Sequence, residues 1–153
     1  MVLAPSSATA RAFTELVRPA RGRRGDTMEA EVRKSGNGII TIDLKGRLVA
    51  GTGAEQLKAI FNELLAADWR RIILNLSEIS RIDSAGIGEL VAGIRLAKRF
   101  DSQVKLLHVR GQVRDILALS QLLPLLDIYY SEEEAIEAFD NVLPESTQDG
   151  GEE

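Results

Sequence analysis

Alternating hydrophobic and polar positions mark the first patterned part of the chain as strand-like. Residues 29–35 alternate with a period of two, and a second β-prone run, 39–46, follows Gly36-Asn37-Gly38. Asn-Gly between two such runs is a strong hairpin signal, because a type I′ turn needs a positive φ angle at both central residues. Two antiparallel strands are therefore predicted to open the patterned region.

Helical periodicity follows in four stretches, where apolar residues recur three and four positions apart. The stretches begin near Thr52, Ser84, Val113 and Ser131, and the second extends to Arg99 while the third extends to Leu123, before Pro124. Thr52 and Ser131 are each followed three residues later by a glutamate, which is the spacing of a capping box. The pattern predicts four amphipathic helices, two of which begin with such a box.

Short apolar runs between the helical stretches predict further strands. Residues 70–76 form a run short enough for a strand buried on both faces, and residues 77–83 are predicted to turn. Two more strands are predicted at 104–109 and 127–130. Strands that alternate with helices indicate an α/β fold: a mostly parallel sheet of about five strands, the first two antiparallel, with about four helices.

The patterned region spans residues 28–143 and is predicted to be one domain, since 153 residues are too few for two ordinary domains. Residues 1–27 contain five arginines and two acidic residues without regular patterning. This segment is expected to be a disordered extension, or an artefact of start-site choice. Residues 144–153 form an acidic tail with no apolar residue after its proline, and this tail is expected to be disordered.

Composition narrows the classes of protein to which the chain can belong. Its net charge is −4, so no overall basic field favours nucleic acid or an anionic membrane surface. The sequence contains no cysteine, which excludes disulfides and thiolate metal sites, and it has no run of about 18 apolar residues for a membrane span. We therefore expect a cytoplasmic protein without nucleic-acid or membrane partners.

Ser84, which starts the second predicted helix, is the first candidate for chemistry. A serine nucleophile needs a base, yet the single histidine is His108, at the end of a predicted strand. Ile82 also stands where a nucleophile elbow requires glycine. Asp83 and Glu89 do not share a helical face, and there is no histidine pair to bind a metal. The sequence therefore predicts no enzyme activity, no cofactor and no metal site.

A structural role explains Ser84 in part, since serine and aspartate are common at helix N-termini and Asp83 can share the capping. That role does not explain Gly86 and Gly88, because glycine costs roughly 1 kcal/mol relative to alanine inside a helix. Small residues there leave the first turn open to a partner surface. A phosphate on Ser84 suits the positive end of the helix dipole, but its charge of roughly −1.5 to −2 is unfavourable to a docked protein.

The segment LNLSEISRIDSAGIGELV, the order of strands and helices, and the closing SEEEAIEAF resemble the STAS domain of stand-alone bacterial anti-sigma-factor antagonists. The resemblance covers nearly all of Glu29 to Phe139, and IDSAGIG is its most specific part. It implies that Ser84 is phosphorylated by the anti-sigma factor, a serine kinase, and dephosphorylated by a PP2C-type phosphatase. Only the unphosphorylated form then binds the anti-sigma factor and frees the sigma factor. The residues implied to form the partner-binding surface are Ser80, Asp83, Ala85, Gly86 and Ile87.

One departure from the family pattern concerns the partner. Family members often carry an aspartate after Gly-x-Leu at the end of the second strand, where this chain has Val49, so a charged contact with the kinase is absent or replaced. Two alternatives stay open. One is a STAS scaffold subunit of a stress-signalling or lipid-transport assembly that does not cycle phosphate. The other is a nucleotide-binding enzyme that uses the glycines at 51–53, although the rest of such a motif is missing.

Overall fold

The computed structural model describes residues 28–140. The predicted extension, 1–27, and the predicted acidic tail, 144–153, lie outside the described residues, as does the end of the predicted domain, 141–143.

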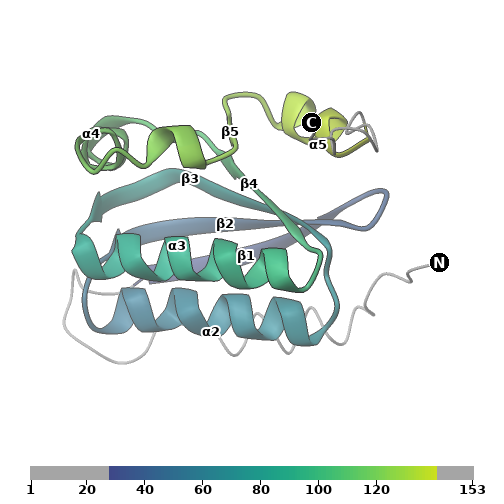
Figure 1. The fold of residues 1–153 in the computed structure, drawn as a ribbon, viewed down its shortest axis with the longest axis horizontal. Helices are drawn as coiled ribbons and strands as arrows, with labels where there is room; N and C mark the ends of the chain where they lie inside the picture. Colours follow the sequence, from purple (N-terminus) through teal and green to yellow (C-terminus); the bar gives the residue numbers. More distant parts are fainter. Residues whose placement is uncertain (1–27, 141–153) are drawn as a thin grey trace.

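A five-stranded sheet with the order β1-β2-β3-β4-β5 forms the centre of the described region (Figure 1). Its strands are β1 (Met28–Ser35), β2 (Ile39–Leu48), β3 (Arg71–Ile82), β4 (Gln103–Leu107) and β5 (Ile128–Tyr129). β1 runs antiparallel to β2, whereas the remaining neighbours are parallel. The predicted α/β fold with a mostly parallel sheet is therefore confirmed.

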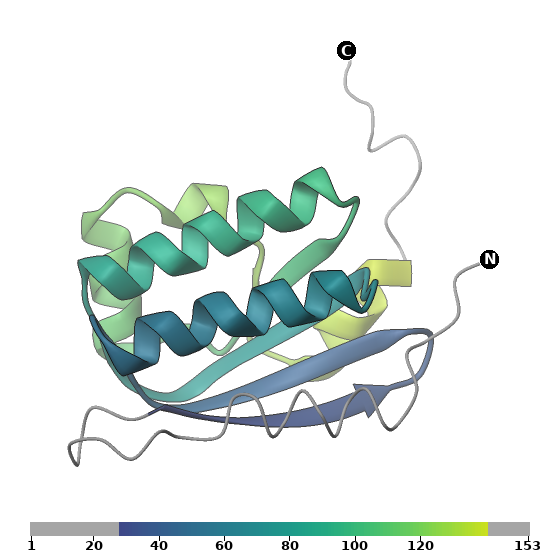
Figure 2. The same ribbon diagram turned by 90° about the horizontal axis from the view of Figure 1, so that it is seen from below.

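Helices cover both faces of this sheet. They are α2 (Thr52–Ala66), α3 (Ser84–Arg99), α4 (Gly111–Leu119) and α5 (Glu132–Asp140), with a short 3-10 helix η1 (Leu123–Leu125) after α4. Figures 1 and 2 show α2 and α3 side by side on one face, α5 on the opposite face, and α4 beside the end of β3. The third predicted helix is shorter than expected, because it ends at Leu119 and Pro124 lies in η1.

The hairpin between β1 and β2 follows from its turn residues. Asn37 and Gly38 have φ angles of 66° and 73°, the positive values that the Asn-Gly motif predicted. Three residues, rather than two, separate the paired ends Ser35 and Ile39.

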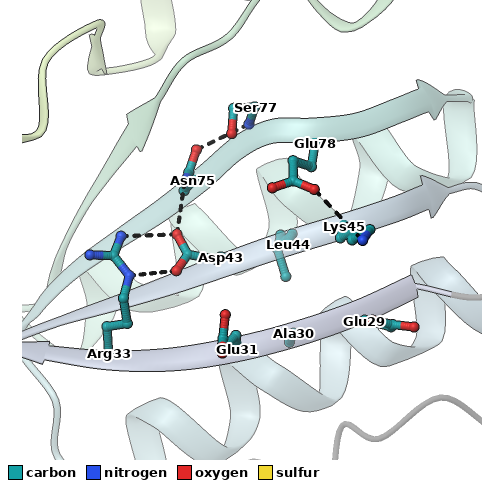
Figure 3. Close-up of a pocket in the computed structure, with 10 residues that line it drawn as sticks. All are labelled: Glu29, Ala30, Glu31, Arg33, Asp43, Leu44, Lys45, Asn75, Ser77 and Glu78. Carbon is teal, nitrogen blue, oxygen red and sulfur yellow. Dashed lines mark hydrogen bonds and ion pairs between the residues drawn. The ribbon is translucent and has the colours of Figure 1, made fainter.

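Side chains on β2 and β3 alternate between two hydrophobic clusters, as the period of two in a strand requires. The larger cluster lies under α2 and α3 and includes Ile42, Leu74 and Phe61. The smaller cluster lies on the other face, where Ile73 packs with Phe139 of α5. Because α5 covers only part of that second face, the remainder stays open over β1, β2 and β3 (Figure 3).

β3 is much longer than the sequence predicted, and the turn expected at 77–83 is wrong. Parallel pairing with β2 continues, through two register shifts, as far as Leu48 opposite Ile82. Ile79 and Ile82 are buried, so the apolar positions of this polar-looking segment still face the core. β3 therefore carries the chain directly to the first turn of α3.

The two predicted capping boxes have different outcomes. The box at Thr52 is wrong, because Thr52 is already helical and the cap residue is Gly51, with a φ of 92° and no side-chain bond. A left-handed cap residue suits glycine, which has no Cβ to clash. At α5 the Ser131 hydroxyl accepts a hydrogen bond from the Glu134 N–H at 3.3 Å, which confirms that half of the second box.

Candidate functional site

The first turn of α3, which carries Ser84, lies at the end of the sheet where the parallel strands β2 and β3 have their carboxyl ends. Leu48 and Ile82 are paired there, so the loop that leads to α2 and the single residue that leads to α3 are neighbours. Loops at the carboxyl ends of parallel strands are the usual place for binding sites in α/β folds. We call residues 83–88 the Ser84 turn.

Asp83 fixes the Ser84 turn by binding backbone groups on both sides of it. Its Oδ1 accepts a hydrogen bond from the Gly86 N–H at 3.0 Å, and its Oδ2 accepts one from the Ala50 N–H at 2.9 Å. Desolvation raises the pKa of Asp83, but hydrogen bonds from the backbone of Ala50, Gly86 and Ala85 outweigh it, so the net pKa lies below its ordinary value. Asp83 is thus an ionised helix cap that also joins the two loops.

Ser84 is the first residue of α3, and its side chain is available to a partner. The residue is exposed, and nothing within residues 28–140 forms a hydrogen bond with its hydroxyl. The helix dipole is positive at this end of α3, and the ionised Asp83 carboxylate offsets part of that charge. The predicted phosphoacceptor therefore lies at the surface, at the positive end of the dipole of α3 and next to the Asp83 carboxylate.

The other predicted partner-binding residues lie around Ser84 with different degrees of exposure. Ala85 and Ile87 are half-buried, and Gly88 is exposed with open space where a side chain would project. Ser80 is exposed on β3, but its hydroxyl donates a hydrogen bond to the Gly46 carbonyl at 3.1 Å. Of Ser80 and Ser84, only Ser84 has a hydroxyl that forms no hydrogen bond with the described residues.

The interpretation that Gly86 keeps the first turn open to a partner is wrong. Gly86 is buried, and a Cβ at this position would lie 2.1 Å from the Leu48 carbonyl oxygen and 2.9 Å from the Leu48 side chain. The glycine lets α3 pack directly on the end of β2. Gly88 does leave the turn open, because no atom of residues 28–140 lies within 4 Å of the position that a Cβ would take there.

The enzyme alternatives gain no support from the arrangement. His108 lies just beyond β4, where its backbone N–H donates to the Tyr129 carbonyl at 2.8 Å, and no hydrogen bond in the described part of the chain joins it to Ser84. Among residues 28–140, no group of three or more histidine, aspartate or glutamate side chains is placed to hold a metal ion. None of the helices described here is long and apolar enough to cross a membrane.

A second polar region, which sequence reasoning missed, lies on the open sheet face (Figure 3). This groove has a volume of about 660 Å³ and is lined by residues of β1, β2 and β3: Glu29, Glu31, Arg33, Asp43, Lys45, Asn75, Ser77 and Glu78. Figure 3 shows Arg33 against Asp43, and Lys45 against Glu78. We call it the sheet groove.

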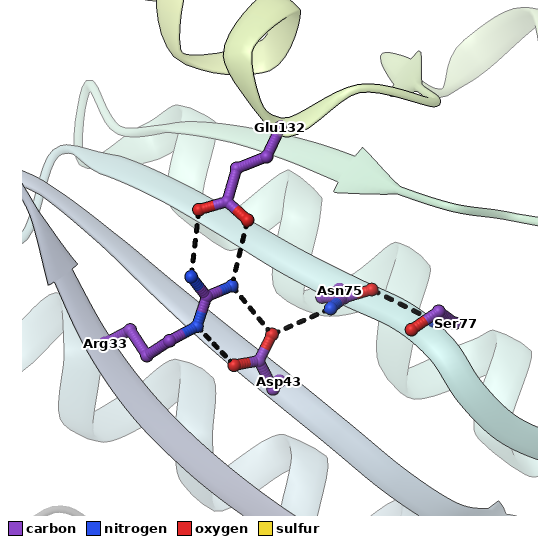
Figure 4. A network of polar contacts seen from close by, with 5 residues as sticks. All are labelled: Arg33, Asp43, Asn75, Ser77 and Glu132. Atoms are coloured by element: carbon purple, nitrogen blue, oxygen red, sulfur yellow. Dashed lines mark hydrogen bonds and ion pairs between the residues drawn. The ribbon is translucent and has the colours of Figure 1, made fainter.

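One network of polar contacts occupies an end of the sheet groove (Figure 4). The Arg33 guanidinium donates to both carboxylate oxygens of Asp43 and to both of Glu132, on α5. Asp43 also accepts a hydrogen bond from Asn75 at 2.7 Å. Polar residues at alternate positions of two buried strands were the sequence signal that could have indicated this network. The contact between Arg33 and Glu132 could not be predicted in this way, because it spans 99 positions and has no local pattern.

Comparisons with known proteins agree with this fold. A family model for the STAS domain matches residues 29–135. BtrV of Bordetella bronchiseptica, named as an anti-sigma factor antagonist, is 27% identical over 108 residues, covering 71% of this chain and 92% of the relative.

Solved structures of SpoIIAA, an anti-sigma factor antagonist and Bacillus cell fate determinant, are also similar. The unphosphorylated form is 25% identical with a TM-score of 0.61, covering 74% of this chain and 98% of that one. The phosphorylated form is 24% identical with a TM-score of 0.56, covering 72% of this chain and 98% of that one. Because the family model matches more than half of the chain, this protein belongs to the STAS domain family.

Proposed function

We propose that this protein is an anti-sigma-factor antagonist that acts by partner switching. The unphosphorylated form binds an anti-sigma factor that is a serine kinase, and the sigma factor is released. Phosphorylation of Ser84 by that kinase ends the complex, and a PP2C-type phosphatase restores the binding form. The observation that carries the proposal is the exposed hydroxyl of Ser84 at the first position of α3, with which no residue of 28–140 forms a hydrogen bond.

The relatives support the same class of protein. BtrV is named as an anti-sigma factor antagonist, and SpoIIAA carries that description and has been solved with and without phosphate. Each of these matches covers more than nine tenths of the relative's own chain. A similarity of that extent to proteins described as antagonists supports the antagonist over the scaffold subunit of a stress-signalling or lipid-transport assembly.

The position of Ser84 supplies the physical basis of a switch. A phosphate at a helix N-terminus meets the positive end of the helix dipole, which offsets repulsion from the ionised Asp83 beside Ser84, so the domain tolerates the modification. A protein docked on the Ser84 turn instead meets a charge of roughly −1.5 to −2 and added bulk in a contact formed for a hydroxyl. If this mismatch costs about 2–4 kcal/mol, affinity falls roughly 30- to 1000-fold.

The proposal is tested by measuring affinity for kinase-type anti-sigma factors of the same genome. Ser84→Ala is expected to bind like the wild type, whereas enzymatically phosphorylated protein and Ser84→Asp lose affinity, the phosphorylated form by roughly 30- to 1000-fold. Ser120→Asp is the matched control, because Ser120 is an exposed serine just after α4 and is not among the predicted partner-binding residues.

Equal affinity of Ser84→Ala, Ser84→Asp and phosphorylated protein contradicts the proposal. An intact mass without phosphate after kinase treatment, together with a stable co-purifying partner, favours the scaffold that does not cycle phosphate. Nucleotide binding at micromolar concentration supports the enzyme alternative instead.

A further inference from the structure

β3 extends far beyond its neighbour β4, and this leaves part of its outer edge without a partner strand. β4 pairs with β3 only from Arg71 to Asn75, whereas β3 continues to Ile82. An unpaired strand edge presents N–H and C=O groups that are costly to bury without hydrogen bonds. Along this stretch the neighbour of β3 is α4, which lies beside the end of the strand in Figure 1.

Gln112, in the first turn of α4, binds both backbone groups of Ile82. Its Oε1 accepts a hydrogen bond from the Ile82 N–H at 2.9 Å, and its Nε2 donates to the Ile82 carbonyl at 3.2 Å. A glutamine side chain carries the same amide donor and acceptor as a peptide group. Gln112 therefore replaces one residue of the missing strand at the end of β3.

This contact lies immediately before the Ser84 turn. Ile82 is 3% exposed, and the next residue, Asp83, caps α3. On the β2 side, the turn is held by the hydrogen bond from the Ala50 N–H to Asp83. On the other side, Gln112 provides the hydrogen bonds to the last residue of β3.

We propose that Gln112 is a positioning residue for Ser84, which it holds in place through Ile82 and Asp83. The inference rests on the proposed function, because it assigns Gln112 a part in presenting the hydroxyl for phosphorylation. Phosphoryl transfer needs the attacking oxygen in line with the phosphorus, and a misplacement of about 1 Å can cost about 100-fold in rate. Without Gln112 the end of β3 loses both bonds on its outer edge, and the geometry of the turn is less well defined.

The test compares Gln112→Ala and Gln112→Glu with Gln103→Ala. Gln112→Glu keeps an acceptor for the Ile82 N–H but loses the donor to its carbonyl. Gln103→Ala is the matched control, since Gln103 is an exposed glutamine at the other end of the sheet. Two quantities are measured: the rate of Ser84 phosphorylation by the kinase, with kcat separated from KM, and hydrogen exchange of the backbone N–H groups of residues 82–86.

Gln112→Ala is expected to lower kcat for Ser84 phosphorylation about tenfold to 100-fold and to speed exchange of the Ile82 and Gly86 N–H groups. Gln112→Glu falls between it and the wild type, and Gln103→Ala changes neither quantity. An unchanged kcat in Gln112→Ala, or unchanged exchange at 82–86, overturns the inference. If the wild type is not phosphorylated at all, the proposed function fails, and the exchange measurement still decides whether Gln112 holds the turn.

Discussion

The Ser84 turn and the sheet groove are both polar, but their side chains bind different kinds of group. In the sheet groove, the side chains of Arg33 and Asp43 form hydrogen bonds with each other. Arg33 also binds the Glu132 side chain, and Asp43 also binds the Asn75 side chain. In the Ser84 turn, backbone N–H groups of Ala50 and Gly86 donate to the Asp83 carboxylate. Arg33 and Asp43 are thus bound by neighbouring side chains, whereas in the turn the Ser84 hydroxyl has no hydrogen bond among the described residues.

This difference shows why the sheet groove is the weaker candidate for a functional site. A ligand that binds Arg33 or Asp43 in the sheet groove has to compete with the contacts between Arg33 and its two carboxylates. A protein docking on the Ser84 turn meets a hydroxyl that has no partner in the described part of the chain, on a backbone that Asp83 already holds in place. Preorganisation of this kind lowers the cost of binding.

The largest effect on stability is expected from Gly86→Ala. The added methyl group meets the Leu48 carbonyl oxygen, a backbone atom, so α3 has to move away from the end of β2. We expect a loss of about 1–3 kcal/mol in the free energy of unfolding, the usual range for overpacking. Urea denaturation measures this change directly.

Gly88→Ala is the matched control for Gly86→Ala, because both glycines lie in the first turns of α3. A side chain at Gly88 projects into open space, so alanine is expected to stabilise the helix by up to about 1 kcal/mol. If the two variants have equal stability, the packing role assigned to Gly86 is wrong. A loss of kinase affinity in the stable Gly88→Ala variant sharpens the comparison, because it places the partner against the exposed side of the turn.

The sequence predicted α3 better than any other element, including both of its ends. Its apolar stripe and the aspartate before it are local signals, and local signals determine where a helix begins. The end of β3 was missed because pairing with β2 outweighs the turn-like composition of 77–83. Gln112 was missed for a related reason, since a glutamine in a helix has no pattern and its partner, Ile82, is 30 positions away.

Only those features of the candidate site that depend on residues 83–88 themselves could be predicted from the sequence. The position of Ser84 at a helix start follows from Asp83 and the periodicity after it. The contact between Asp83 and Ala50 requires the ends of two parallel strands to meet, and the reason for Gly86 requires the position of Leu48. Both depend on tertiary packing, which a single sequence does not display residue by residue.

A smaller effect on stability is expected from Asp83, and it depends on pH. Asp83→Ala removes the helix cap and is expected to cost about 1 kcal/mol at pH 7. Asp83→Asn keeps an oxygen acceptor but not the charge. Because the folded-state pKa of Asp83 is depressed, its charge stabilises the fold above the unfolded-state pKa of about 3.9, and this contribution is lost as the pH falls through the folded-state pKa.

The unfolding free energies of wild type and Asp83→Asn, measured between pH 7 and pH 2, check this prediction. Their difference is expected to be constant near neutral pH and to shrink below about pH 4. Subtracting the two curves removes the contribution of other carboxylates, including Asp43, whose pKa is also lowered. A difference that does not change with pH contradicts the role of Asp83 as an ionised cap.

The smallest effect is expected from Arg33→Ala, which breaks the network of the sheet groove. The Arg33 side chain is 41% exposed, and exposed ion pairs contribute about 0–1 kcal/mol, so the loss of stability stays below about 1 kcal/mol. Desolvation already raises the pKa of Asp43, and Arg33 opposes that effect, so removing Arg33 raises this pKa toward its ordinary value. NMR titration of the Asp43 carboxyl measures the shift.

Kinase affinity of Arg33→Ala is expected to remain that of the wild type, because no group of the Ser84 turn contacts Arg33 in the part of the chain that the structure describes. A fall in affinity with an intact fold would move the partner surface from the edge of the sheet to its open face.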